Sequence, residues 1–144
     1  MVIRMKIKQV SVFLENRAGR LSNIVSNLGD SGISIRAISL ADTSSFGILR
    51  LIVDDTETAV RILKDRGFTV RITDVAAVKV EDKPGELGKI LQIIENAGLN
   101  VEYVYGLSDN LKGSAILIMR FDNMEKGIPE LQDNSVECLT HDCL

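Results

Sequence analysis

A repeat with a period of 66 residues relates the two halves of the chain, and it constrains the fold more than any other feature of the sequence. Gly19 and Gly32 recur as Gly85 and Gly98 at this spacing. The same spacing also relates Leu21 to Leu87, Ile24 to Ile90, Leu28 to Ile94 and Gly47 to Gly113. Beyond Gly113 the second copy needs about two extra residues to stay aligned. Two copies of so long a unit indicate a duplicated domain rather than a solenoid.

Periodicity in the first copy predicts the element order β-α-β-β-α-β. Strands are predicted by alternating or β-branched runs at 6–14, 33–40, 47–53 and 68–72. Helices are predicted where apolar residues recur at helical spacing, over 20–31 and from Asp55 or Thr56 to Gly67. Gly32 is suited to end the first helix in the left-handed conformation.

The second copy repeats this order. Its predicted strands cover 75–81, 99–107, 114–121 and about 135–140, and its predicted helices cover about 85–97 and 123–132. Pro129 must lie in the first turns of the last helix or weaken it.

The sequence predicts two domains that follow each other without a linker. Domain 1 covers 1–73 and domain 2 covers 74–144, and only Thr73-Asp74 separates the neighbouring strands. Without a flexible linker, we expect rigid packing that protects the strand edges. The predicted fold class is α+β: two ferredoxin-like βαββαβ units packed side by side, with antiparallel sheets and helices on one face.

The charge of the chain argues against two classes of partner. Its formal net charge is −3 and its pI is about 5.2, and Lys and Arg are scattered singly. A nucleic acid or an anionic membrane needs a basic face, so neither is expected. No apolar run approaches the roughly 20 residues of a membrane span. The start of the chain lacks the apolar core of a signal peptide, which predicts a cytoplasmic protein.

No catalytic set can be assembled from the sequence. The only histidine is His141, and no metalloprotease, Walker or dinucleotide-binding motif occurs. Cys138, His141 and Cys143 lack a fourth ligand for zinc, and a disulfide is not expected in a reducing compartment. We therefore predict no catalytic residues, no metal, no cofactor and no enzymatic activity.

The two loops before the first helix of each copy are the best candidates for a binding site. Each carries a glycine just before the helix, at Gly19 and Gly85. Unpaired backbone N–H groups at a helix start attract a carboxylate or phosphate, and glycine lets a ligand approach the backbone. Asn16 and Asp82 either hold the polar head of a ligand or only cap the helices.

These loops resemble those of ACT domains, which are regulatory modules of amino-acid metabolism. The resemblance rests on Glu15-Asn-Arg-Ala-Gly-Arg-Leu21 and Glu81-Asp-Lys-Pro-Gly-Glu-Leu87. Gly32-Ile-Ser-Ile35 and Gly98-Leu-Asn-Val101 are similar to the start of the second ACT strand. The resemblance covers nearly the whole chain, as two ACT domains without an attached catalytic domain.

The resemblance implies both an arrangement and a ligand. ACT domains pair side by side in one eight-stranded sheet, and an amino acid often binds at the pair interface, between the first loop of one domain and the second strand of the other. The implied ligand-binding residues are Asn16, Arg17, Ala18, Gly19, Arg20, Leu21, Ser34, Asp82, Lys83, Pro84, Gly85, Glu86, Leu87 and Asn100. Ala18, Ser34 and Asp82 depart from the usual Pro, Asn and Asn, so we expect one strong and one weak site.

The sequence therefore predicts a non-catalytic sensor that binds an amino acid at the interface of two ACT domains. The ligand carboxylate would meet N–H groups near 18–20 or 84–86, and its ammonium would meet Asn16, Asp82 or Asn100. A protein-interaction module without a ligand is one alternative. An unrecognised enzyme, which would need a hidden acid–base pair, is another. The partner is an amino acid, while a homodimer and a regulated partner protein remain open.

Overall fold

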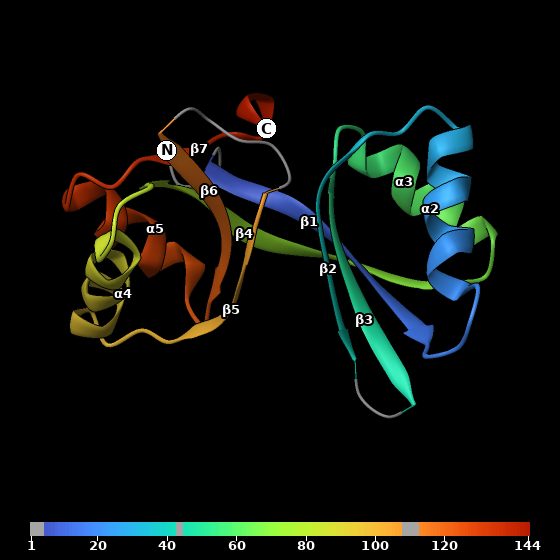
Figure 1. The fold of residues 1–144 in the computed structure, drawn as a ribbon, viewed down its shortest axis with the longest axis horizontal. Helices are drawn as coiled ribbons and strands as arrows, with labels where there is room; N and C mark the ends of the chain where they lie inside the picture. The colour runs from blue at the N-terminus through green and yellow to red at the C-terminus, as the bar shows by residue number, and fades with distance from the viewer. Residues whose placement is uncertain (1–4, 43–44, 108–112) are drawn as a thin grey trace. The chain divides into compact units, whose positions relative to one another are not determined.

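The chain divides into two compact units. This computed structural model describes residues 5–42, 45–107 and 113–144. One unit is Lys8–Thr73, and the other is Asp74–Leu144 together with the start of the chain up to Ile7. We call them unit 8–73 and unit 74–144. Figure 1 shows that in each unit two helices cover one face of a sheet.

Unit 8–73 has the ferredoxin-like order of elements. These are β1 (Lys6–Glu15), α2 (Arg20–Asp30), β2 (Ile35–Asp42), β3 (Phe46–Val53), α3 (Thr56–Asp65) and the first part of β4 (Thr69–Glu81). The strands lie in the order β2-β3-β1-β4, and β3 pairs antiparallel with both β1 and β2. The order arises because each helix connects two strands that have one other strand between them: α2 passes over β3, and α3 passes over β1.

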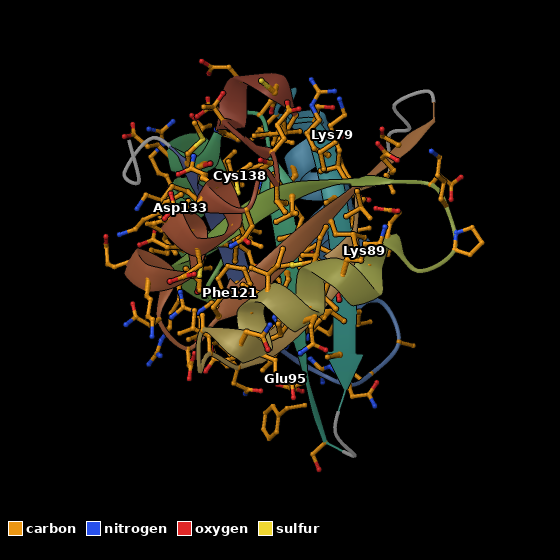
Figure 2. All side chains as sticks on the ribbon, turned by 90° about the vertical axis from the view of Figure 1, so that its left-hand side faces the viewer. Lys79, Lys89, Glu95, Phe121, Asp133 and Cys138 are labelled. Atoms are coloured by element: carbon orange, nitrogen blue, oxygen red, sulfur yellow. The ribbon has the colours of Figure 1, made fainter. Side chains whose placement is uncertain are left out.

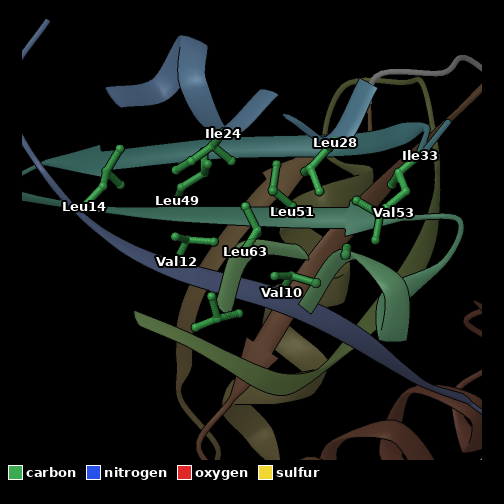
Figure 3. Close-up of a cluster of buried hydrophobic side chains, with 12 residues drawn as sticks. Val10, Val12, Leu14, Ile24, Leu28, Ile33, Leu49, Leu51, Val53 and Leu63 are labelled. Carbon is green, nitrogen blue, oxygen red and sulfur yellow. The ribbon is translucent and has the colours of Figure 1, made fainter. Parts of the chain in front are cut away.

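The core of unit 8–73 lies between this sheet and its helices. Val10, Val12 and Leu14 alternate along β1, and Val10 and Val12 stand opposite Leu51 and Leu49 of β3 in the strand register. All of them are buried, with Ile24 and Leu28 of α2 and Ala59 and Leu63 of α3 (Figure 3). Period-two and helical spacing therefore place every one of these side chains on the same interface.

Unit 74–144 repeats the architecture. Its elements are the rest of β4, α4 (Glu86–Asn96), β5 (Val101–Gly106), β6 (Ser114–Phe121), α5 (Met124–Asp133), β7 (Cys138–Leu139) and a 3₁₀ turn (His141–Cys143). The strand order is β7-β4-β6-β5. Its core includes Val78, Ile94, Ile128 and Phe121, which is labelled in Figure 2.

Each of the four helices in the described ranges ends in the same pair of backbone hydrogen bonds. In α4, for example, Gly98 N–H donates to Glu95 and Leu99 N–H donates to Ile94. This is a Schellman motif, which requires a left-handed residue. Glycine fills that position after three helices, as predicted for Gly32, but Ser135 fills it after α5 with φ of 64°. Ser135 therefore holds a conformation that is costly for a residue with a Cβ.

Three of the predicted strands differ most from the observed ones. The runs 68–72 and 75–81 form the single strand β4, and Arg120 binds the Asp74 carbonyl through Nη1 at 2.6 Å. The strand predicted at 135–140 is only Cys138–Leu139. It is short because the N–H groups of Ser135 and Val136 complete the end of α5.

The second helix of each copy begins at a side-chain cap. Asp55 accepts a hydrogen bond from Thr58 N–H at 3.2 Å, and Asn123 accepts one from Lys126 N–H at 3.1 Å. Pro129 is the sixth residue of α5 and lies in its second turn. No helix in the described part of the chain has the length and apolar character to cross a membrane.

The strand register corrects one detail of the repeat. Phe46 pairs with Glu15, and Ser114 pairs with Glu81, so the spacing between the copies is already 68 residues at the start of the third strand. Gly47 therefore corresponds to Ala115, and its predicted match to Gly113 is wrong. The two extra residues of the second copy lie between β5 and β6, where a hairpin can lengthen without changing the strand pairing.

Candidate functional site

The loops before α2 and α4 have the same backbone conformation. Gly19 and Gly85 immediately precede the helices with φ of 88° and 89°, and no side chain caps either helix. Asn16 N–H donates to the Ser45 carbonyl, and Asp82 N–H donates to the Gly113 carbonyl. The alternative that Asn16 and Asp82 cap the helices is therefore wrong, because each loop places a left-handed glycine at the capping position.

The space in front of both glycines is open. A Cβ built on Gly19 or on Gly85 would meet no atom within 4 Å. The other residues of the two loops, from Asn16 to Ala18 and from Asp82 to Pro84, are exposed. A ligand can therefore approach the backbone at the positive end of either helix.

The two loops differ in charge. In unit 8–73, Arg17 and Arg20 both pair with Glu15, at 3.4 and 3.5 Å. In unit 74–144, Lys83 pairs with Glu81 at 3.3 Å and Lys89 pairs with Glu86 at 3.0 Å. The first loop thus has two cationic side chains that share one carboxylate, whereas in the second loop each cationic side chain has a carboxylate of its own. An anion is attracted more strongly to the first loop.

Within each unit, the predicted strand residues lie away from the predicted loop. Ser34 N–H donates to Asp54 Oδ1 at 3.0 Å, and Asn100 N–H donates to Asp122 Oδ1 at 3.0 Å. These pairs join the start of the second strand to the end of the third, while the loops adjoin the start of the third strand. The structure brings 16–21 together and 82–87 together, but neither Ser34 nor Asn100 joins the loop of its own unit.

A pocket lies beside each loop, at equivalent positions in the two units. Its volume is about 250 Å³ in unit 8–73 and about 450 Å³ in unit 74–144. Both are lined by the end of the first strand, the start of the first helix and the turn after the second helix. The equivalent lining residues include Arg20 and Glu86, Phe46 and Ser114, and Phe68 and Val136.

These pockets were not predicted from the sequence, except that Arg20 and Glu86 belong to the predicted loops. A signal was present in the repeat. Three phenylalanines of the first copy, Phe13, Phe46 and Phe68, align with Lys79, Ser114 and Val136 in the second. Residues that diverge so strongly between copies of one scaffold mark the surface where the copies differ in chemistry.

Ion pairs satisfy the charges of the pocket in unit 74–144. Lys79, labelled in Figure 2, lies 3.7 Å from Glu137. Glu86 accepts a hydrogen bond from Lys89, also labelled there, and this bond raises the pKa of Lys89. The pocket is therefore polar with compensated charge.

The cysteines of the C-terminal segment have different environments. Burial, with a smaller contribution from Glu137, raises the pKa of Cys138 to about 11, so its thiol is protonated at neutral pH. Cys143 is exposed, and both cysteines are free. Over residues 5–42, 45–107 and 113–144, no three His, Cys, Asp or Glu side chains are grouped as metal ligands would be.

Comparison with known proteins agrees with this architecture. A family model described as an ACT domain pair matches residues 5–142. A crystal structure of a protein from Bacteroides thetaiotaomicron is 37% identical, with a TM-score of 0.89 over 95% of this chain and 94% of that one. No curated protein matches the sequence.

More distant structures share the fold. The ligand-free regulatory subunit of aspartate kinase from Thermus thermophilus has a TM-score of 0.67 at 16% identity, over 90% of this chain and 93% of that one. The corresponding subunit from Thermus flavus has a TM-score of 0.63 at 16% identity, over 90% and 92%. Because the family model spans nearly the whole sequence, the chain belongs to the family of ACT domain pairs.

Proposed function

We propose that this chain is a regulatory protein that binds a free amino acid at its loop–helix starts and catalyses no reaction itself. The observation that carries the proposal is the repeated, uncapped helix start behind Gly19 and Gly85. Its membership of the ACT domain pairs supports a regulatory role. So does the fold that it shares with proteins described as regulatory subunits of aspartate kinase.

The chemistry of the loop suits an amino acid. The ligand carboxylate would accept hydrogen bonds from N–H groups of the first helical turn, where the helix dipole also favours an anion. The ligand ammonium would meet Asn16 in one unit and Asp82 in the other, both of which are exposed. The neutral Asn16 and the anionic Asp82 would hold the ammonium unequally, so we propose two sites of different affinity.

A thermal-shift screen of the common amino acids tests the proposal. An amino acid present at 100 times its Kd should stabilise the folded chain by about 2.7 kcal/mol. Isothermal titration of the best ligand should then show saturable binding. If no amino acid raises the Tm of folded protein at millimolar concentration, the proposal fails and an interaction module without a ligand is favoured.

Glycine variants locate the site. Gly19→Ala and Gly85→Ala place a methyl group where the ligand would approach. Gly32→Ala and Gly98→Ala are the controls, because they add a methyl group at the opposite ends of the same helices, away from the proposed site. All four glycines have positive φ, and a Cβ on any of them would meet no atom within 4 Å. The four variants therefore carry similar backbone strain. Binding should be lost only in the loop variants, and an equal loss in all four would point to strain instead.

A further inference from the structure

The pocket of unit 8–73 concentrates the aromatic side chains of the chain. The sequence contains four phenylalanines, and Phe13, Phe46 and Phe68 line this one pocket. Phe13 is 39% exposed and Phe46 is 60% exposed, so both present apolar surface to solvent. Phe68 is half-buried and packs against the core of the unit. Such exposed rings at a concave surface are typical of a binding site rather than of a core.

Arginines supply the polar part of the same pocket. Arg20 and Arg66 line it, and the Arg20 guanidinium carbon lies 5.9 Å from the centre of the Phe68 ring. Arg20 shares Glu15 with Arg17. Arg66 is exposed, and its guanidinium forms no ion pair within the described ranges. The Arg71 guanidinium carbon lies 5.9 Å from the centre of the Phe13 ring. Arg17, Arg20, Arg66 and Arg71 thus surround the pocket, whose lining holds the Glu15 carboxylate, and this leaves the pocket positively charged.

We propose that this Phe–Arg pocket, formed by Phe13, Phe46, Phe68, Arg20 and Arg66, binds a small aromatic carboxylate. The ligand ring would pack against the phenylalanines, and its carboxylate would accept paired hydrogen bonds from Arg66 with support from Arg20. The volume agrees with a ligand of this size. A cavity of about 150 Å³ holds benzene, and this pocket of about 250 Å³ has room for a ring and a short acid chain.

The equivalent pocket of unit 74–144 serves as an internal contrast. Lys79, Ser114 and Val136 stand where the three phenylalanines stand, and Glu86 and Asn134 replace the two arginines. Its lysines are already paired with carboxylates. Among the described residues, this second pocket therefore has neither the rings nor an unpaired guanidinium group, and aromatic acids are selected by unit 8–73.

The inference does not depend on amino-acid binding at the loops. The Phe–Arg pocket recognises a ring and a carboxylate, and the Glu15 carboxylate in its lining is already paired with Arg17 and Arg20. An aromatic acid without an amino group should therefore bind. Binding of amino acids without any binding of 3-phenylpropionate would support the proposed function while contradicting this inference.

Titration followed by two-dimensional NMR tests the pocket. The probe is 3-phenylpropionate, and the comparison ligands are 3-phenylpropylamine, which reverses the charge, and acetate, which lacks the ring. We expect saturable shifts from 3-phenylpropionate at the backbone amides of Phe46, Gly67 and Phe68, and much weaker effects from the other two. No saturation at millimolar concentration, or equal binding of the amine, would overturn the proposal.

Variants that copy the other unit provide the matched test. Arg66→Asn installs the residue of position 134, and Phe68→Val installs that of position 136. Each should weaken 3-phenylpropionate binding, and Arg66→Asn, which removes the charge-assisted pair of hydrogen bonds, should weaken it by about tenfold or more. Because Arg66 is exposed, that variant should fold normally. Asn134→Ala in the other pocket should leave the affinity unchanged, and affinity that survives Arg66→Asn would contradict the assignment.

Discussion

At the scale of single residues, the two copies use different caps for equivalent helices. Asp55 caps α3 and Asn123 caps α5, and each accepts a hydrogen bond from the N–H three residues later. Only the aspartate titrates. Hydrogen bonds from the side chain and the backbone of Thr58 lower the pKa of Asp55 below 3.8, the value of an unperturbed carboxyl.

Replacing Asp55 should remove an acid-sensitive part of the stability. A carboxyl whose pKa is lowered by folding stabilises the folded state above its unfolded pKa, and this contribution is lost as the pH falls through the folded value. Asparagine is a comparable cap without titration. As the pH drops below 3.8, the Tm of the wild type should therefore fall more than the Tm of Asp55→Asn.

Thermal melts across the acid range measure this difference. Asn123→Asp is the matched variant, because it gives α5 the cap that α3 has. It should make the stability of the chain more sensitive to acid. A constant difference between wild type and Asp55→Asn at every pH would contradict the role assigned to the Asp55 carboxylate.

At the scale of elements, the two copies fill one contact between the third strand and the second helix in opposite ways. The second copy has the larger of the two strand residues, and the first copy has the larger of the two helix residues. Phe121 of β6 and Gly127 of α5 occupy the positions of Val53 and Ala59, and all four residues are buried. A Cβ built on Gly127 would overlap the ring of Phe121. A larger strand residue thus requires a smaller helix residue at this contact.

A double-mutant cycle tests that exchange. Gly127→Ala should destabilise the chain by about 1–3 kcal/mol through overpacking. Phe121→Val alone should also destabilise it, because it leaves a cavity. The double variant restores the pair of the first copy and should lose less stability than the sum, by about 1 kcal/mol or more. Urea unfolding gives the free energy of unfolding of each variant. If the losses of the two single variants simply add up in the double variant, the contact between Phe121 and Gly127 does not couple the two positions.

The elements were predictable where local signals are strong. Helical spacing and the glycines that follow three helices located those helices to within a residue or two, and β6 was predicted over 114–121 as observed. The last strand was overextended, because the end of α5 uses Ser135 in a conformation that glycine usually supplies. The Phe–Arg pocket was missed because its residues come from four separate segments, which meet only through the strand register.

At the scale of the whole molecule, the start of the chain belongs to the unit that is built from its end. Met5 packs against the core of unit 74–144, and Lys6 pairs with Glu125 of α5. Ile7 is completely buried. The sequence predicted a boundary at 73/74, and periodicity alone gave no reason to assign the first residues to the second half.

Met5→Ala should therefore destabilise unit 74–144, most of which is distant from Met5 in sequence. Losing this half-buried side chain should cost about 1 kcal/mol, and hydrogen exchange should quicken mainly in α4 and α5. Val60→Ala is the matched variant, since Val60 is half-buried against the core of unit 8–73. It should quicken exchange mainly in α2 and α3. Identical exchange patterns in the two variants would contradict the assignment of Met5.

The change of spacing from 66 to 68 residues also shows where the chain accepts additional sequence. Asn16 and Asp82 donate the same backbone hydrogen bond to the residue that precedes the third strand, although the connection in the second copy is longer. The two copies thus differ in length there, while both pockets keep their place in the fold. The segment between Gly106 and Ser114 is accordingly the position to graft a fluorophore tag or an affinity peptide when ligand binding is to be reported in real time.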